Sequence, residues 1–303
     1  MDPLVFVLVA AAAVLHVAWN VLLKTAGDPL RAAAVGLTAG AAVIVPAATI
    51  GWLGIGRPDI PPEAIGLAAL SGLLEAAYFG FLAAAYRRGD LSVVYPIARG
   101  TAPLLAVAVG IGILGERLGP EGIAGVGALL AGLLALQRPW QFLRSRSGGG
   151  RGDPAVPFAL ATGVTIAAYS AVDRVGARVA GPWFYAGLIW IFGCLFLWGW
   201  VLLSDRMAAR TSPNLREAPE PLLDTRRAAF GGLITLGAYL LILVAFSVAP
   251  LTAVAPLRES AIVLASGWGT FRLGEGANRA DAYRRIAASA LVVAGAVLLA
   301  LDG

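Results

Sequence analysis

The chain alternates between long apolar runs and short breaks that are charged or rich in proline and glycine. Ten runs stand out, at 4–24, 32–55, 64–86, 91–114, 119–137, 156–177, 182–204, 228–248, 251–273 and 283–301. A helix of about twenty residues crosses roughly 30 Å of hydrocarbon, because it rises about 1.5 Å per residue. The pattern therefore predicts an all-α integral membrane protein with ten transmembrane helices.

Three further segments need separate interpretation: the N-terminal run and two polar segments between the runs. The N-terminal "MDPLVFVLVAAAAVLHVAWNVLLK" has no basic segment before its apolar run, so we expect a retained first helix rather than a cleaved signal peptide. A glycine- and arginine-rich stretch, "QRPWQFLRSRSGGGRGDP", separates runs five and six and predicts a flexible linker over 138–155. The segment "SDRMAARTSPNLREAPEPLLDTRR" (204–227) is too polar and proline-rich to cross lipid.

Composition agrees with this class of protein. Hydrophobic residues make up 59% of the 303 positions and charged residues 14%, whereas soluble domains are nearer half apolar and a quarter charged. The net charge of +5 comes from arginines in short loops, so we expect no nucleic-acid partner. Cys194 is the single cysteine, so an intrachain disulfide is excluded. Its position in an apolar run favours a packing role.

The sequence also repeats itself. "GDLSVVYPIARGTAPLLAVAVGIGILGE" (89–116) aligns with "APLTAVAPLRESAIVLASGWGTFRLGE" (249–275). With one residue of slippage, Pro96 and Arg99 match Pro256 and Arg258. "HVAWNVLLK" (16–24) aligns with "IAAYSAVDR" (166–174), and "GLLEAAYFG" (72–80) aligns more weakly with "GLITLGAYL" (232–240). Three matches in the same order indicate a duplication with five spans in each copy.

An odd number of spans per copy gives the two copies opposite orientations in the membrane, as in many secondary transporters. The loop charges agree with one orientation of the whole chain. Alternate loops, beginning with the one between runs one and two, hold 17 lysines and arginines, whereas the remaining loops hold 4. Because cytoplasmic loops carry the excess of positive charge, we expect both termini on the outer side.

Taken together, "HVAWNVLLK", "YPIARGTAPLL…LGERL" and "APLRES…LGE" resemble the drug/metabolite transporter superfamily, in its EamA-like branch. The resemblance covers nearly the whole chain and implies EamA-like five-helix repeats over 1–137 and 156–303. It also implies a secondary transporter whose central cavity is lined by both halves. Members move amino acids, sugar phosphates, nucleotide sugars, drugs and other small metabolites. The second copy departs from the first at "RES" (258–260), which replaces "RGT" (99–101), so any functional pairing is asymmetric.

We therefore expect a transporter, in a bacterial inner membrane, that moves a small anionic or zwitterionic metabolite by alternating access. A lipid or lipid-phosphate translocator on the same fold and a non-transporting accessory protein remain alternatives. An enzyme using His16 and Glu75 is disfavoured, because no nucleophile–base pair or metal-ligand set accompanies them. We expect no cofactor or metal, since no phosphate loop or dinucleotide fingerprint is present. The sequence does not determine the oligomeric state.

Two arginines are the first candidates for the substrate site. Arg99 and Arg258 lie about eight residues into their spans, each shortly after a proline, and buried ionisable groups by default face a cavity or a partner. Their guanidinium groups could bind a carboxylate or phosphate. The alternative is an internal ion pair with Glu75 or Glu259. Because adjacent residues do not share a helix face, we expect Arg258 and Glu259 to have different partners.

Other charged residues lie within or at the ends of the predicted spans. Glu75 lies midway along the third span, where a carboxyl could exchange a proton for substrate or could lock the bundle in a salt bridge. Asp173 and Arg174 lie near the end of the sixth span, and we expect them to reach the interface by snorkelling. Glu116 and Glu275, in the two LGE endings, are expected to cap helices or bridge loops at the membrane surface.

Aromatic and polar residues complete the predicted site. His16, Trp19 and Asn20 lie three and four positions apart on one helical face, and Tyr169 is the repeat equivalent of Trp19. They predict either a cavity wall or interhelical packing. The weaker cavity candidates are Tyr78, Tyr95, Trp190 and Tyr239.

Overall fold

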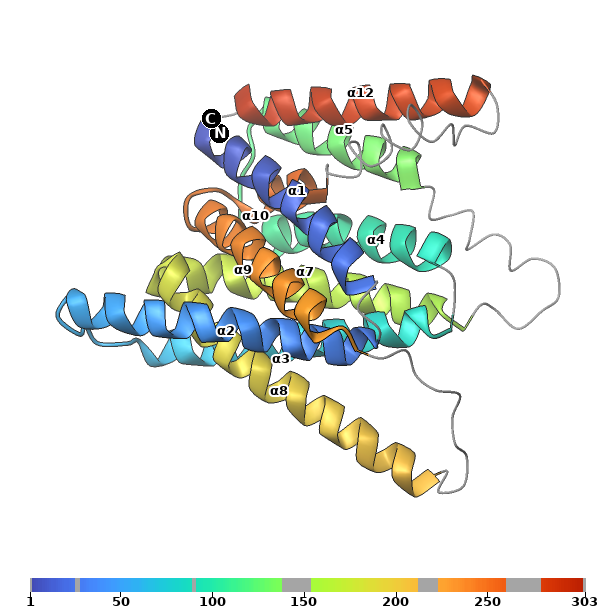
Figure 1. The fold of residues 1–303 in the computed structure, drawn as a ribbon. Helices are drawn as coiled ribbons and strands as arrows, with labels where there is room; N and C mark the ends of the chain where they lie inside the picture. Colours follow the sequence, from blue (N-terminus) through green and yellow to red (C-terminus); the bar gives the residue numbers. More distant parts are fainter. Residues whose placement is uncertain are drawn as a thin grey trace.

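The computed structural model describes residues 2–24, 28–88, 91–137, 154–211, 223–259 and 279–301. Regular secondary structure in these ranges is entirely helical (Figure 1). The helices are α1 (Pro3–Lys24), α2 (Pro29–Gly54), α3 (Pro62–Tyr86), α4 (Leu91–Gly112), α5 (Pro120–Gln137), α7 (Val156–Ala180), α8 (Pro182–Thr211), α9 (Thr225–Val248), α10 (Leu251–Glu259) and α12 (Arg279–Leu301). One helix overlaps each predicted run. Most of the predicted linker and the later part of run 251–273 lie outside the described residues.

Within the described ranges, five helices are long and apolar enough to cross a membrane, namely α2, α3, α7, α8 and α9. Helices α1, α4, α5 and α12 contain shorter apolar stretches. Large apolar side chains point away from the bundle, and Val7, Ile50 and Leu195 are each more than 60% exposed. Such a surface is unfavourable in water but natural against lipid, because lipid tails are as apolar as these side chains.

Two helices begin earlier than hydropathy alone predicts, because polar caps extend them. The Oδ1 atom of Asp28 accepts a hydrogen bond from Leu30 N at 2.9 Å, and α2 begins at Pro29 rather than near residue 32. Asp224 likewise accepts from Arg227 N at 3.0 Å, and α9 begins at Thr225 rather than near 228. Capping satisfies backbone N–H groups that the first turn leaves without partners.

The helices form a layered bundle (Figure 1). Helices α5 and α12 pack against each other along one edge. Helices α2, α3 and α8 pack together at the opposite edge, and α1, α4, α7, α9 and α10 lie between these groups. Within the bundle α3 packs along α7 and α1 packs along α9. The middle layer therefore joins helices from both halves of the sequence.

Glycines allow the closest helix contacts. A Cβ atom at Gly232 of α9 would lie 2.1 Å from the carbonyl oxygen of Gly36 in α2. At the far edge, a Cβ atom at Gly295 of α12 would lie 2.6 Å from the carbonyl oxygen of Gly125 in α5. Both distances are too short for any larger residue without movement of the backbone. Small residues at such crossings are the usual means of helix association in lipid.

Candidate functional site

A cavity of about 40 Å³ lies in the middle of the bundle. Seven helices contribute its lining residues: His16 and Trp19 from α1, Glu75, Tyr78 and Phe79 from α3, Arg99 from α4, Tyr169 from α7, Trp190 from α8, Thr235 and Tyr239 from α9, and Arg258 from α10. Charged, aromatic and hydroxyl groups thus converge within an otherwise apolar bundle.

The structure brings together most of the residues that the sequence singled out. The cavity is lined by eight of the eleven predicted site residues: His16, Trp19, Glu75, Tyr78, Arg99, Tyr169, Tyr239 and Arg258. Glu259 contacts the two arginines instead of the cavity surface. The side chains of Asn20 and Tyr95 lie outside the described residues. Phe79 and Thr235 also line the cavity, and sequence reasoning did not select them.

Glu259 forms the centre of a buried charge cluster. Both of its carboxylate oxygens accept hydrogen bonds from Nη1 of Arg99, each at 3.0 Å. Its Oε1 atom also accepts from Nε of Arg258 at 3.3 Å. The three side chains are between 3% and 13% exposed, so water screens them little. Two guanidinium groups and one carboxylate leave this cluster with one net positive charge.

The cluster corrects one expectation. Arg258 and Glu259 were expected to have different partners, yet they contact each other. Adjacent side chains leave a helix about 100° apart, but the long arginine side chain can bend toward its neighbour. The alternative of an internal ion pair is realised for Arg99 with Glu259.

Asp173 is the principal residue that sequence reasoning misplaced. It is fully buried, and its Oδ1 atom accepts a hydrogen bond from the Tyr185 hydroxyl at 3.1 Å. Its Oδ2 atom accepts from the hydroxyl of Tyr239, which lines the cavity. The predicted snorkelling is wrong because α7 continues to Ala180 and tyrosines from two other helices cover the carboxylate. The signal that could have found it is the four-residue spacing from Tyr169, which places both on one helix face.

Arg174 is also buried rather than interfacial. It is 9% exposed, and its Nε atom lies 3.3 Å from Oε1 of Glu116. Glu116 in turn accepts hydrogen bonds from the backbone N–H groups of Leu251, at 2.7 Å, and Thr252, at 2.9 Å. The capping role expected of Glu116 is therefore confirmed, and this residue ties the segment between α4 and α5 to the start of α10. Glu275 lies outside the described residues.

Aromatic rings form the apolar wall of the cavity. Tyr169 packs edge-to-face against Tyr78 and Tyr239, with ring centroids 6.0 and 6.1 Å apart. Trp190 packs against Tyr239 at 5.8 Å. On α1, Nδ1 of His16 accepts a hydrogen bond from Nε1 of Trp19 at 2.9 Å. Because an accepting ring nitrogen carries no proton, His16 is neutral in this arrangement.

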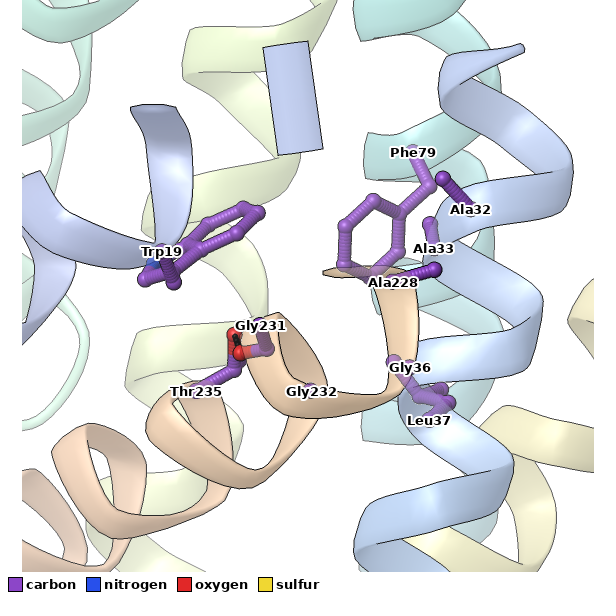
Figure 2. A pocket seen from close by; sticks show the side chains of 10 residues that line it. All are labelled: Trp19, Ala32, Ala33, Gly36, Leu37, Phe79, Ala228, Gly231, Gly232 and Thr235. Carbon is purple, nitrogen blue, oxygen red and sulfur yellow. Dashed lines mark hydrogen bonds between the residues drawn. The ribbon is translucent and has the colours of Figure 1, made fainter. Parts of the chain in front are cut away.

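A smaller, mostly apolar hollow adjoins this wall (Figure 2). It shares Trp19, Phe79 and Thr235 with the central cavity. Alanines, glycines and a leucine from α2 and α9 form the rest of its surface: Ala32, Ala33, Gly36, Leu37, Ala228, Gly231 and Gly232. In Figure 2 the rings of Trp19 and Phe79 lie on opposite sides of the hollow. The hollow offers contacts to an apolar group and few to a charged one.

Comparisons with known proteins agree with this architecture. The family model described as the EamA-like transporter family matches residues 3–137. Among the solved structures that match, one crystal structure has a TM-score of 0.65 and 23% sequence identity, and the match covers 99% of this chain and 98% of that one. At this identity the match supports the fold alone. No curated protein matches the sequence. With the EamA-like match over residues 3–137, the expected resemblance to the drug/metabolite transporter superfamily is confirmed, and the apolar helices agree with a multi-pass integral membrane protein.

Proposed function

We propose that this protein is a secondary transporter that moves a small anionic or zwitterionic metabolite through the central cavity by alternating access. The observation that carries the proposal is the charge cluster of Arg99, Arg258 and Glu259 beside an aromatic wall, buried within an apolar bundle. Buried ionisable groups are costly in a membrane and are retained at transport pathways.

The proposed architecture has ten spans in two inverted halves, 1–137 and 156–303, joined by the linker 138–155. Four pairs of positions that align between the repeats support it, because both members of each pair line the cavity: Trp19 with Tyr169, Glu75 with Thr235, Phe79 with Tyr239, and Arg99 with Arg258. The helix contacts agree with this relation between the halves. Helix α1 packs on α9, and α7, which aligns with α1, packs on α3, which aligns with α9. A two-fold relation between halves would produce both patterns.

The cavity chemistry suggests the substrate class. The net positive charge of the arginine cluster favours a carboxylate or phosphate, and a guanidinium can bind either group through two parallel hydrogen bonds. The rings of Tyr78, Tyr169 and Trp190 favour a flat or apolar body on the same molecule. Glu75 lines the same cavity and could accept an ammonium group. A zwitterion with an apolar side chain would satisfy all three features.

One observation favours a second candidate, a translocator of lipids or lipid phosphates. The hollow of Figure 2 is mostly apolar and adjoins the cavity, so it could take an acyl chain while the arginines hold the head group. In either case we propose a bacterial inner membrane with both termini on the outer side, because the loop charges favour that orientation.

Uptake into proteoliposomes tests the proposal. The full chain would be assayed with radiolabelled phenylalanine, benzoate, glucose 6-phosphate, choline and a lysophospholipid as representatives of five chemical classes. We expect uptake of an anion or zwitterion, and we expect Arg258→Gln to reduce it roughly 10- to 100-fold, since a hydrogen bond to a charged group contributes about 1.5–3 kcal/mol.

Arg31→Gln is the matched control, because Arg31 forms an exposed pair with Asp205 outside the cavity. Uptake of choline alone, or unchanged uptake by folded Arg258→Gln protein, would contradict the anion site. Uptake of the lysophospholipid alone would favour the second candidate.

A further inference from the structure

Asp173 is a buried carboxylate that the proposed anion site does not use. It lies in α7, has no exposed surface, and is held by two tyrosine hydroxyls, one on each oxygen. A residue kept only to brace helices would not need an ionisable group, since burying one is costly even when it is paired. One of its two donors, Tyr239, also lines the central cavity.

Glu75 lines the same cavity as Tyr239. It extends from α3, is 8% exposed, and its carboxyl faces the Tyr239 hydroxyl. A phenol has one O–H to donate and can accept through its oxygen. Since that O–H is donated to Asp173, Glu75 can bond to the phenol oxygen only by donating a proton of its own. The arrangement therefore accommodates two carboxyl groups with one proton between them.

We propose that Glu75, Tyr239 and Asp173 form a proton-binding site that couples transport to the proton gradient, with Asp173 as its buried member. The inference rests on the proposed function. A proton from water on one side forms an O–H bond on a carboxylate oxygen of this group. After the cavity opens to the other side, that bond breaks and the proton returns to water.

Among the described residues, polar groups from several helices face the pair. They include Ser71 from α3, Tyr169 from α7, Tyr185 from α8, Tyr239 from α9 and Arg258 from α10, with Cys194 of α8 near Glu75. Arg99 belongs to the charge cluster on Glu259, and His16 is neutral because its Nδ1 accepts from Trp19. The groups that change charge are thus the two carboxyls.

The charge balance gives the direction of coupling. Arg99, Arg258 and Glu259 together carry one positive charge. With Glu75 and Asp173 both ionised the whole group is negative by one unit, with one proton it is neutral, and with two it is positive by one unit. An anionic substrate therefore binds best to the protonated form and travels with the proton, whereas a cation would exchange against it.

Infrared titration of the purified full chain tests proton binding without any substrate. We expect a C=O band of a protonated carboxyl that titrates with pH, disappears in Glu75→Gln, and titrates with a different midpoint in Asp173→Asn. Asp205→Asn is the matched control, because Asp205 is an exposed carboxylate paired with Arg31. Tyr239→Phe is a second variant in case Asp173→Asn does not fold, and it should change the frequency of the band.

Proteoliposomes then test coupling with whichever compound of the uptake panel the wild type moves. With a gradient of one pH unit, acid outside, one coupled proton permits up to about tenfold accumulation of a zwitterion. We expect accumulation in the wild type and in Asp205→Asn, and none in Asp173→Asn. Should Asp173→Asn accumulate substrate as the wild type does, or should Asp173→Asn and Tyr239→Phe leave the infrared titration unaltered, the inference is wrong. If no panel compound is transported, the proposed function fails, and the infrared result still decides whether the proton site exists.

Discussion

Arg99 in α4 and Glu259 in α10 are 160 positions apart in sequence, yet Nη1 of the arginine lies 3.0 Å from each carboxylate oxygen of the glutamate. The contact joins the two halves of the chain at the centre of the bundle. Because both side chains are largely buried, removing one partner leaves the other charge without compensation.

The first prediction concerns this pair. Glu259→Gln should destabilise the protein by about 3–5 kcal/mol, which is the usual cost of breaking a buried pair by removing one partner. The double variant Arg99→Met with Glu259→Met should lose less than the sum of the two single variants. Thermal unfolding in detergent measures Glu259→Gln, the two single methionine variants and the double variant. The exposed pair Arg31 and Asp205 is the control, and its coupling energy should stay below about 1 kcal/mol. Equal coupling energies for the two pairs would contradict the prediction.

The second prediction concerns the glycine crossing of α2 and α9. Gly232→Ala should lower the unfolding temperature, because its Cβ atom would lie 2.1 Å from the carbonyl oxygen of Gly36 and the two helices would have to separate. Overpacking of this kind costs about 1–3 kcal/mol. Gly66→Ala is the control, since a Cβ atom there would meet nothing within 4 Å, and it should be neutral or slightly stabilising. The prediction fails if both variants unfold at the same temperature.

The third prediction concerns the cap on α10. Glu116→Ala removes the acceptor for two backbone N–H groups, those of Leu251 and Thr252, and the partner of Arg174. We expect a loss of about 1–2 kcal/mol, as for other helix caps. Hydrogen exchange measured by mass spectrometry should show faster exchange in peptides that contain the start of α10. The amides at the start of α2, which Asp28 caps independently, should exchange at their wild-type rate.

The fourth prediction separates the two candidate substrates. Gly231→Leu would fill part of the hollow in Figure 2 without adding to the lining of the central cavity. Transport of a small metabolite should keep its KM within about threefold, because the arginine cluster and aromatic wall are unchanged. The metabolite therefore keeps its contacts and its binding energy. Transport of a lysophospholipid should fall strongly, because its acyl chain would lose its space. Similar losses for both compounds would place the hollow on the pathway of the small metabolite.

Much of the candidate site could be predicted from the sequence, because membranes make charged residues conspicuous. Arg99, Arg258 and Glu75 stand out in apolar runs, and all three line the cavity. Phe79 and Thr235 carry no such signal, because an aromatic or a threonine is ordinary in a membrane helix. The weak third alignment was the available clue, because it pairs Phe79 with Tyr239 and Thr235 with Glu75.

What the sequence determined by itself is the class of protein and the positions of the helices, because the free energy of placing about twenty apolar residues in lipid depends on local composition. The partners of the buried charges were decided only by the tertiary structure. Glu259 binds arginines from two helices, and Asp173 is covered by tyrosines from two others. Hydropathy places a residue along its own helix, whereas which groups surround it depends on how the helices cross, and that crossing depends on close contacts such as Gly36 with Gly232.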